Sequence, residues 1–262
     1  MLSLSDLSKN FGGLQVLQNV NLTIPERGIV GLIGPNGAGK TTVFNLITGL
    51  LVPSAGRIDF LGRRLNGMAP YQVTRCGVAR TFQNIRIFKE MSVLENVLVA
   101  VRPQHKYSVT GALLWYRGLQ GPEPRGEELA REFLRRVGLV DKAEQLAGTL
   151  SYGAQRRLEL ARALATSPKL LLLDEPAAGM NTVEKQQLMD EIIKLDQSGL
   201  SILLIEHDMR FVMGMCKQII VMNFGRVIAV GSPEQIRQDP QVIEAYLGRD
   251  DEPDLASAKR NS

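Results

Sequence analysis

The sequence is poor in the residues that build disulfide-linked or metal-bound small domains. Its 262 residues include two cysteines, two histidines and one tryptophan, and aromatic residues make up only 5%. Cys76 and Cys216 are too few for a disulfide framework or for a zinc site built from several cysteines. This excludes a disulfide-stapled secreted scaffold and favours a reducing compartment.

Long hydrophobic runs and a strong charge bias are also missing. No apolar stretch approaches the ~18 residues of a membrane-spanning helix, and the first residues lack the basic-then-apolar order of a secretory signal. We therefore expect the chain not to cross a membrane by itself, although a partner can hold it at one. The formal net charge of +4 is compatible with anionic ligands but gives no reason to expect a nucleic-acid partner.

The composition that remains is globular, with 44% hydrophobic and 22% charged residues. It excludes disorder, collagen and coiled coil as descriptions of the whole chain. The apolar pattern predicts strands at residues 2–7, 15–24, 28–33, 57–60, 169–174, 201–206, 218–223 and 226–230. Helical patterns follow several of them, at residues 41–50, 158–165 and 183–195. Strands that alternate with helices and have short continuous apolar runs predict an α/β fold, with a largely parallel sheet covered on both faces.

Two stretches depart from this alternation. Residues 93–137 have a helical pattern interrupted by Gly and Pro, and they contain Trp115. We interpret this stretch as a helical subdomain inserted into the α/β scaffold. After a short helical piece at residues 233–247, the last residues, 249–262, contain few large apolar side chains and are predicted to be disordered.

One glycine-rich segment matches the phosphate-binding pattern G-x-x-x-x-G-K-[ST]. It consists of Gly34, Pro35, Asn36, Gly37, Ala38, Gly39, Lys40 and Thr41, and Thr42 comes next. The glycines let backbone N–H groups point at phosphate oxygens, the lysine lies near the β and γ phosphates, and the threonine offers its hydroxyl to Mg²⁺. An accidental glycine-rich turn is the alternative, but the segment lies between a predicted strand and a predicted helix. The pattern therefore predicts a nucleoside triphosphate site.

Two consecutive carboxylates follow the apolar run LLLL, and a histidine follows the next one, SILLIE. A parallel strand ends at the ligand edge of its sheet, so Asp174 is expected to hold Mg²⁺ and Glu175 to polarise a water for attack on the γ phosphate. The alternative is a pair of solvated acids that cap the next helix. His207 is expected to hydrogen-bond the γ phosphate. A lone histidine at a strand end is more often structural, but its place one strand after the acids favours a catalytic role.

These motifs, together with RTFQN and LSYGAQ, resemble the ATP-binding cassette of ABC transporters over about residues 2–248. The resemblance implies a P-loop NTPase fold with an antiparallel β subdomain and a helical subdomain at about residues 84–165. It also implies that Phe11 stacks on adenine, although a strand residue packed in the core is the alternative. Gln83 would sense Mg²⁺ and link the two subdomains.

The segment LSYGAQ resembles the family's signature motif, and its Ser151, Gly153 and Gln155 would bind nucleotide from the start of a long helix. It departs from the usual L-S-G-G-Q because Tyr152 replaces a glycine, which leaves the local backbone angles open. Asn181 likewise replaces a common aspartate. These departures are similar to those of the ATP-binding subunits of branched-chain amino acid importers.

The resemblance implies ATP and Mg²⁺ as cofactors, with Thr41, Gln83 and Asp174 facing the metal and Glu175, His207 and Gln83 serving catalysis. A second cassette, identical or related, would complete each site, because the P-loop of one chain faces the signature of the other. The expected role is an ATPase that energises an importer at the cytoplasmic face of the inner membrane, with permease subunits and, indirectly, a periplasmic or extracellular substrate-binding protein. A lipopolysaccharide-type exporter and a soluble, non-transport cassette ATPase are the alternatives.

In such a cassette the segment after Gln83 forms the groove for a permease helix. The apolar residues expected in it are Ile85, Ile87, Phe88, Met91 and Val93. We expect several of them to be exposed, as at an interface. Packing inside the helical subdomain is the alternative.

Overall fold

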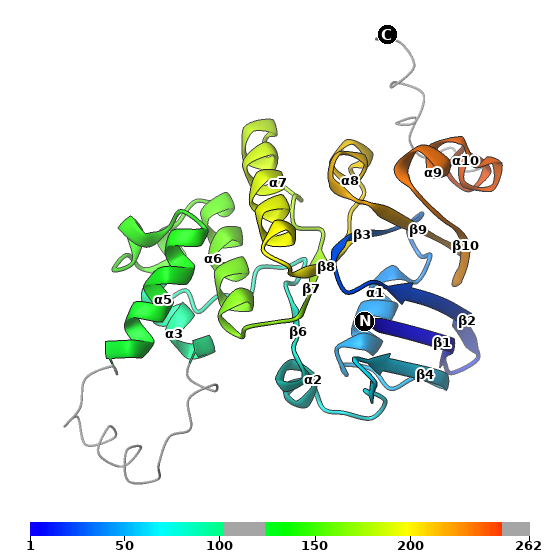
Figure 1. The fold of residues 1–262 in the computed structure, drawn as a ribbon, viewed down its shortest axis with the longest axis horizontal. Coiled ribbons are helices and arrows are strands. Elements are labelled where there is room, and N and C mark those ends of the chain that lie inside the picture. The colour runs from blue at the N-terminus through cyan, green and yellow to red at the C-terminus, as the bar shows by residue number, and fades with distance from the viewer. Residues whose placement is uncertain (102–123, 248–262) are drawn as a thin grey trace.

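Six strands form the central sheet of the computed structural model, which describes residues 1–101 and 124–247 (Figure 1). Their order across the sheet is β10-β9-β3-β8-β7-β6, and only β10 runs antiparallel to its neighbour. The strands are β3 (Gly28–Ile33), β6 (Val78–Arg80), β7 (Leu170–Asp174), β8 (Ser201–Ile205), β9 (Gln218–Asn223) and β10 (Arg226–Gly231). The predicted parallel sheet is therefore confirmed.

A second, antiparallel sheet has the strand order β2-β1-β4-β5. Its strands are β1 (Leu2–Phe11), β2 (Leu14–Ile24), β4 (Ala55–Phe60) and β5 (Arg63–Arg64). The long strands β1 and β2 are half-buried and alternate between buried and exposed positions along much of their length. This is the pattern of a sheet that covers a core with one face.

The inner strands β3, β7, β8 and most of β9 are buried on both faces of the central sheet, which explains why they are almost continuously apolar. Along β7, Leu170 and Leu172 pack in one core with α1 (Lys40–Ile47) and the antiparallel sheet. Leu171 and Leu173 pack on the other face in a second core, which the helices after residue 92 supply. The period of two along each strand sends alternate residues to opposite faces.

The helices that build the second core are spread along the chain. They are α3 (Val93–Val101), α5 (Pro124–Arg136), α6 (Tyr152–Ala165), α7 (Thr182–Gln197), α8 (Met209–Met215), α9 (Pro233–Gln238) and α10 (Pro240–Leu247). Helices α3, α5 and α6 pack on one another at the end of the molecule away from the antiparallel sheet (Figure 1). They lie within the stretch predicted to be the helical subdomain. No helix among the described residues is long and apolar enough to span a membrane.

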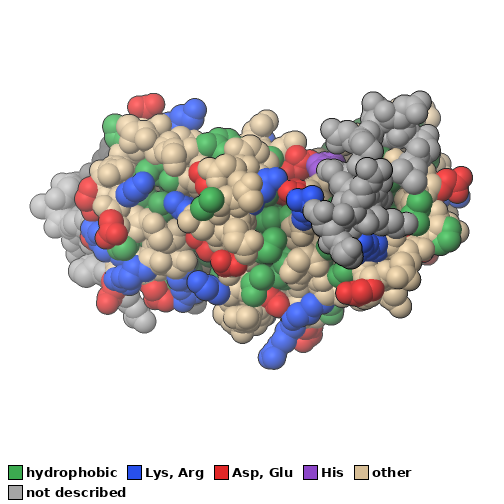
Figure 2. Space-filling model, turned by 90° about the horizontal axis from the view of Figure 1, so that it is seen from above, with side chains coloured by type: hydrophobic (Ala, Val, Ile, Leu, Met, Phe, Trp, Pro, Cys, Tyr) green, Lys and Arg blue, Asp and Glu red, His purple; other side chains and the backbone are tan. Residues whose placement is uncertain are grey.

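Several short elements were not predicted from the sequence. They are α2 (Pro70–Cys76), β5, β6, α8 and the 3₁₀ turns Val140–Lys142 and Ala147–Thr149. Runs of two to seven residues carry too little periodicity to be recognised. Trp115, the second histidine, His105, and the predicted disordered tail at residues 249–262 lie outside the described residues. On the face shown in Figure 2, Lys and Arg side chains are interspersed with Asp and Glu, as the small net charge predicts.

The expected exposure of the apolar cluster after Gln83 is largely wrong. Val93 is fully buried, because it begins α3 and packs in the core between the helices and the sheet. Ile85, Ile87 and Met91 are half-buried, and Ile87 packs against the same core. Phe88 alone of the five is exposed, at 47%.

Candidate active site

The site forms where three neighbouring parallel strands end. In the register of the central sheet, Asp174 at the end of β7 is level with Ile205 at the end of β8, and Ile205 is level with Leu32 of β3. Parallel strands present their carboxyl ends at one edge, where ligands bind in open α/β sheets. The glycine-rich segment after β3, the two acids at β7 and His207 after β8 therefore come together at this edge.

The glycine-rich segment leaves the start of α1 open. Gly34 has φ 148°, and a Cβ on it would lie 2.0 Å from the carbonyl oxygen of Met222, so only glycine fits there. Gly39 is the N-cap of α1 with φ 98° and provides no side-chain cap. The first N–H groups of a helix lack partners within the helix. An uncapped start of this kind suits phosphate oxygens, which accept those hydrogen bonds and interact favourably with the helix dipole.

Lys40, the first residue of α1, is folded back onto the segment. Its Nζ donates hydrogen bonds to the carbonyl oxygens of Gly34 and Pro35, at 2.6 and 3.0 Å. Burial lowers the pKa of Lys40 to about 8, and the nearby carboxylates of Glu175 and Asp174 oppose this shift. The lysine therefore places a weakly solvated cation between the phosphate cradle and the two acids. Thr41 follows it and is exposed.

Asp174 is buried, with 3% of its surface exposed, and it is paired with a residue that the sequence analysis missed. Arg80, at the end of β6, donates to the Asp174 carboxylate at 2.6 Å and to the Asn45 side-chain oxygen at 2.7 Å. The guanidinium also lies 4.9 Å from the ring of Phe82 and 5.4 Å from that of Phe44. One feature of the sequence indicates this pair. Arg80 lies in the short apolar segment VAR, and a buried charge needs a partner.

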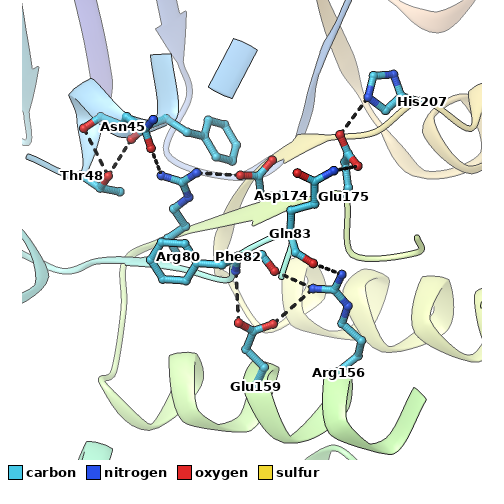
Figure 3. Close-up of polar contacts among 11 residues, drawn as sticks. Asn45, Thr48, Arg80, Phe82, Gln83, Arg156, Glu159, Asp174, Glu175 and His207 are labelled. Carbon is cyan, nitrogen blue, oxygen red and sulfur yellow. Dashed lines mark hydrogen bonds and ion pairs between the residues drawn. The ribbon is translucent and has the colours of Figure 1, made fainter. Parts of the chain in front are cut away.

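Glu175 turns away from Asp174 and joins two other predicted residues (Figure 3). Its carboxylate accepts a hydrogen bond from Gln83 Nε2 at 2.7 Å and lies 2.9 Å from His207 Nε2. The backbone of Glu175 has φ 48°, a left-handed conformation that is rare for residues other than glycine. Strained backbone of this kind is concentrated at functional sites. The turn gives the two neighbouring acids different surroundings, and the Glu175 side chain is 18% exposed.

The signature segment begins α6 in regular geometry, despite its substitutions. Ser151 is the N-cap, and its hydroxyl accepts a hydrogen bond from the backbone N–H of Ala154 at 3.4 Å. Tyr152 is the first residue of the helix, so the side chain at this position does not disturb the backbone. Gln155 Nε2 donates to the carbonyl of Leu150. Asn181 caps α7, accepting a hydrogen bond from the N–H of Glu184 at 2.9 Å.

One predicted aromatic residue is exposed, and a second, which was not predicted, contacts the phosphate cradle. Phe11 ends β1 and is 44% exposed, so the alternative of a core residue is wrong. Tyr246 of α10 was missed. Burial raises its pKa to about 12, and a hydrogen bond with the Gly34 backbone opposes that shift. The C-terminal helix thus touches the first residue of the cradle, although nothing in the sequence near Tyr246 signals this.

A cavity of about 680 Å³ lies elsewhere, at the amino ends of the central strands. Arg27, Lys169 and Leu200, which precede β3, β7 and β8, line it together with Phe133 of α5. None of its lining residues belongs to the phosphate cradle, the acid pair or the signature. The site described above is defined by its chemistry rather than by the size of a cavity.

The fold and the site define a P-loop nucleotide-binding protein of the ATP-binding cassette class. A family model described as "ABC transporter" matches residues 17–178, and one described as "Branched-chain amino acid ATP-binding cassette transporter" matches residues 226–252. The chain belongs to the ABC transporter ATP-binding family, whose members hydrolyse ATP to power transport. It is accordingly a nucleotide-binding ATPase.

Curated relatives match almost the whole chain. The high-affinity branched-chain amino acid transport ATP-binding protein LivG of Escherichia coli is 47% identical over 95% of this chain and 98% of its own length. BraF of Pseudomonas aeruginosa, with the same description, is 46% identical over the same shares. The lipopolysaccharide export system ATP-binding protein LptB of Haemophilus influenzae is 34% identical over 95% of this chain and 97% of its own length.

Solved cassettes share the fold. A nucleotide-free ATP-binding cassette from an ABC transporter superposes with a TM-score of 0.82 at 31% identity, covering 95% of this chain and 99% of its own. A second cassette, solved as a dimer in a post-hydrolysis state with ADP and Pi, superposes with a TM-score of 0.75 at 25% identity, covering 89% and 99%.

Proposed function

We propose that this chain is the ATP-hydrolysing subunit of an importer for branched-chain amino acids. The observation that carries the proposal is the match of residues 226–252 to a model specific to branched-chain amino acid cassettes. That region lies outside the residues shared by ABC transporters at large, 17–178, so it carries information about the subgroup. The identity of 46–47% to LivG and BraF supports the same substrate class.

The residues at the sheet edge are suited to hydrolysis of a bound nucleotide. Glu175 acts as the general base that polarises the attacking water, since its carboxylate is partly exposed and held by Gln83 and His207. Lys40 and the open start of α1 bind the β and γ phosphates. His207 hydrogen-bonds the γ phosphate. The phosphate charge favours the protonated form of Lys40 and so opposes the effect of burial on its pKa.

The donors at this edge also fit Mg²⁺. Thr41, Gln83 and Asp174 offer hydroxyl, amide and carboxylate oxygens, the hard ligands that this ion prefers. The described residues contain no group of three or more His, Cys, Asp or Glu that could hold a metal, and Mg²⁺ at nucleotide sites commonly takes one or two carboxylates together with phosphates. When bound, the ion neutralises charge on the β and γ phosphates.

We further propose that two cassettes act together on permease subunits at the cytoplasmic face of the membrane. The P-loop and the signature of one chain belong to two different sites, each completed by a second cassette of the same or a related sequence. The dimeric post-hydrolysis cassette supports this arrangement by its similarity. A substrate-binding protein outside the membrane would deliver the amino acid to the permease.

An exporter ATPase is the second candidate, since LptB is 34% identical over nearly the whole chain. The higher identity to LivG and the match at residues 226–252 favour the importer. A soluble cassette ATPase has no comparable observation in its favour.

Uptake in the source organism tests the proposal. Deleting the gene should abolish uptake of radiolabelled leucine at low external concentration and leave maltose uptake unchanged. Wild-type protein should restore leucine uptake, and Glu175→Gln protein should not. If leucine uptake is unchanged while that of another solute is lost, the amino acid assignment is wrong and the importer assignment stands. Depleted surface lipopolysaccharide with normal uptake would favour the exporter.

A further inference from the structure

The segment that carries Gln83 is held by the signature helix. We call residues 82–86 the glutamine segment. Arg156 of α6 donates to the carbonyl oxygens of Phe82, at 2.6 Å, and of Gln83. Glu159, one turn later, accepts from the backbone N–H groups of Phe82 and Arg86, at 3.2 and 3.4 Å. The signature helix therefore supplies side-chain partners to the backbone of a segment 73 to 77 residues away.

The two carbonyls held by Arg156 belong to the peptide groups on either side of Gln83. One peptide joins residues 82 and 83, and the other joins residues 83 and 84. A planar guanidinium offers its donors in a fixed fork, so binding both carbonyls fixes the two peptide planes that flank the Cα of Gln83. The direction in which the Gln83 side chain leaves the backbone is thereby set from the signature helix (Figure 3).

The guanidinium itself has little freedom to move. The Arg156 side chain is 4% exposed and that of Glu159 is 6% exposed, with 3.4 Å between Nη1 and the carboxylate. On its other side, Nη2 donates to the hydroxyl of Tyr152 at 3.0 Å. The ring of Tyr152 packs closely against Gly179, because a Cβ on Gly179 would lie 3.2 Å from the ring. The residue that replaces a signature glycine thus contacts the arginine that holds the glutamine segment.

From Gln83 the contacts continue to the catalytic carboxylate. Gln83 Nε2 donates to Glu175 Oε2 at 2.7 Å, and Glu175 Oε1 lies 2.9 Å from His207 Nε2. Hydrogen bonds thus link Tyr152 to Arg156, Arg156 to the backbone of Gln83, and the Gln83 side chain to Glu175, which contacts His207. A buried ion pair that only filled the core would not need to bind both carbonyls beside the residue that touches the base.

We propose that Arg156 is a positioning residue for ATP hydrolysis, which acts through Gln83 to hold the carboxylate of Glu175 in place. This rests on the proposed role of Glu175 as the general base. Arg156 touches neither nucleotide nor water in this scheme, and its contribution passes entirely through the orientation of Gln83.

A double-mutant cycle tests this pathway. Arg156→Lys keeps the positive charge opposite Glu159 but loses the planar guanidinium that binds both carbonyl oxygens. We expect kcat and kcat/KM for ATP to fall together by about 10- to 100-fold, because small misplacements of reacting groups have effects of this size. In a Gln83→Ala background the same change should have no further effect on kcat, since the residue through which Arg156 acts is gone. Equal losses in both backgrounds would overturn the proposal.

Hydrogen exchange gives a readout that does not depend on activity. Amides of the glutamine segment should exchange about tenfold faster in Arg156→Lys, because its restraint from α6 is weakened. The matched control is Arg131→Lys, in which an arginine that pairs with Glu127 and Glu144 is changed in the same way. It should leave both the exchange of residues 82–86 and kcat unchanged. Unchanged exchange in Arg156→Lys would also contradict the proposal.

The outcomes separate this inference from the proposed function. If the wild-type protein hydrolyses ATP but the cycle is additive, only the role of Arg156 fails. If Glu175→Gln hydrolyses ATP at the wild-type rate, the general base is wrong whatever the cycle shows. Should Arg156→Lys fail to fold, Arg156→Gln with Glu159→Gln takes its place, because removing both charges avoids an unpaired buried carboxylate. The same loss of kcat and the same faster exchange are then expected.

Discussion

Two helices of this protein, α1 and α6, begin at motifs predicted to bind phosphate, but the surroundings of the two starts differ. The start of α1 has glycine at its N-cap and no side-chain cap, and the cation of Lys40 lies beside it. The start of α6 is capped by its own Ser151. A Cβ on Gly153 there would lie 2.7 Å from a carboxylate oxygen of Glu184. Within one chain, the start of α1 is uncapped and has a cation beside the acids Asp174 and Glu175, whereas the start of α6 is already capped and lies close to a carboxylate.

This difference suggests an order of events. An anion entering the start of α1 gains N–H donors, the helix dipole and a cation together. At α6 the neighbouring carboxylate opposes an anion, so the signature gains most when a nucleotide is already held on another chain. The P-loop would then decide affinity, and the signature would decide whether the bound nucleotide is hydrolysed.

The largest expected effect is on the rate of hydrolysis, and it tests the role of Glu175 as the general base. Glu175→Gln should keep nucleotide affinity and lower the hydrolysis rate by about 10²- to 10⁴-fold, because an amide fills the same space but cannot act as a base. His207→Ala should be comparably damaging. Steady-state ATPase assays and binding of a fluorescent ATP analogue measure the two quantities.

An exposed glutamate on α9 provides the control for this substitution. Glu234→Gln makes the same chemical change away from the sheet edge and should leave the rate unchanged. A Glu175→Gln protein with near wild-type turnover would remove Glu175 from the role of base.

The second prediction addresses the two helix starts directly. Lys40→Ala should weaken ATP binding by about 10- to 100-fold, the loss expected when hydrogen bonds from a charged group are removed. Ser151→Arg should leave binding to a dilute, monomeric chain unchanged and abolish hydrolysis. If Ser151→Arg weakens monomer binding as much as Lys40→Ala does, the proposed division between affinity and hydrolysis is wrong.

Mixing the two variants tests whether the sites are shared between chains. In a mixed dimer, one interface pairs the two altered motifs, and the other pairs two intact ones. At most one functional site per dimer should return, so activity should rise from near zero to no more than about half of the wild-type value per dimer, as expected for a site shared between two chains. Full activity of a demonstrably monomeric sample would contradict the shared site.

Most of the fold and the local motifs could be predicted, because both depend on short-range patterns. The glycine-rich segment, the acids after β7 and His207 after β8 each follow an apolar run that the structure confirms as a strand. Ser151 was placed at the start of a long helix through the resemblance of LSYGAQ to the signature motif, and it is the N-cap of α6. Local sequence and parallel-sheet geometry together bring these motifs to one edge.

The partners of these residues could not be predicted, because nothing local specifies them. Arg80 lies 94 residues before Asp174, and Arg156 lies 73 or more residues after the carbonyls that it holds. Such pairs depend on how β6 and α6 are placed in three dimensions. The error at Val93 has a related cause, since an apolar residue after the glutamine segment has the same sequence pattern whether it is exposed or, as the first residue of α3, packed in the core.

The third prediction follows from the lowered pKa of Lys40. In the free protein this pKa is about 8, and bound phosphates favour the charged form and raise it. At pH 7 the lysine is mostly protonated before binding, whereas at pH 9 binding requires proton uptake. Affinity for ATP should therefore fall about tenfold from pH 7 to pH 9. Lys40→Arg stays protonated and should show a flat profile. A flat wild-type profile, measured with the fluorescent analogue, would contradict the lowered pKa.

The smallest expected effect concerns the cap of α6. Ser151→Ala removes the acceptor for the Ala154 N–H and should lower the free energy of unfolding by about 1 kcal/mol, whereas Ser151→Gly should cost only a few tenths. For a chain of this size 1 kcal/mol corresponds to about 2–4 °C in Tm. Ser232→Ala, at the N-cap of α9, is a reference for the same change in another helix. Chemical denaturation measures both.

Nucleotide binding at the P-loop should be unaffected by Ser151→Ala, because α1 is intact. If Ser151→Ala leaves stability unchanged while Ser232→Ala lowers it, Ser151 does not cap α6 in the single chain, and the contrast between the two helix starts would then rest on Lys40 and Glu184 alone.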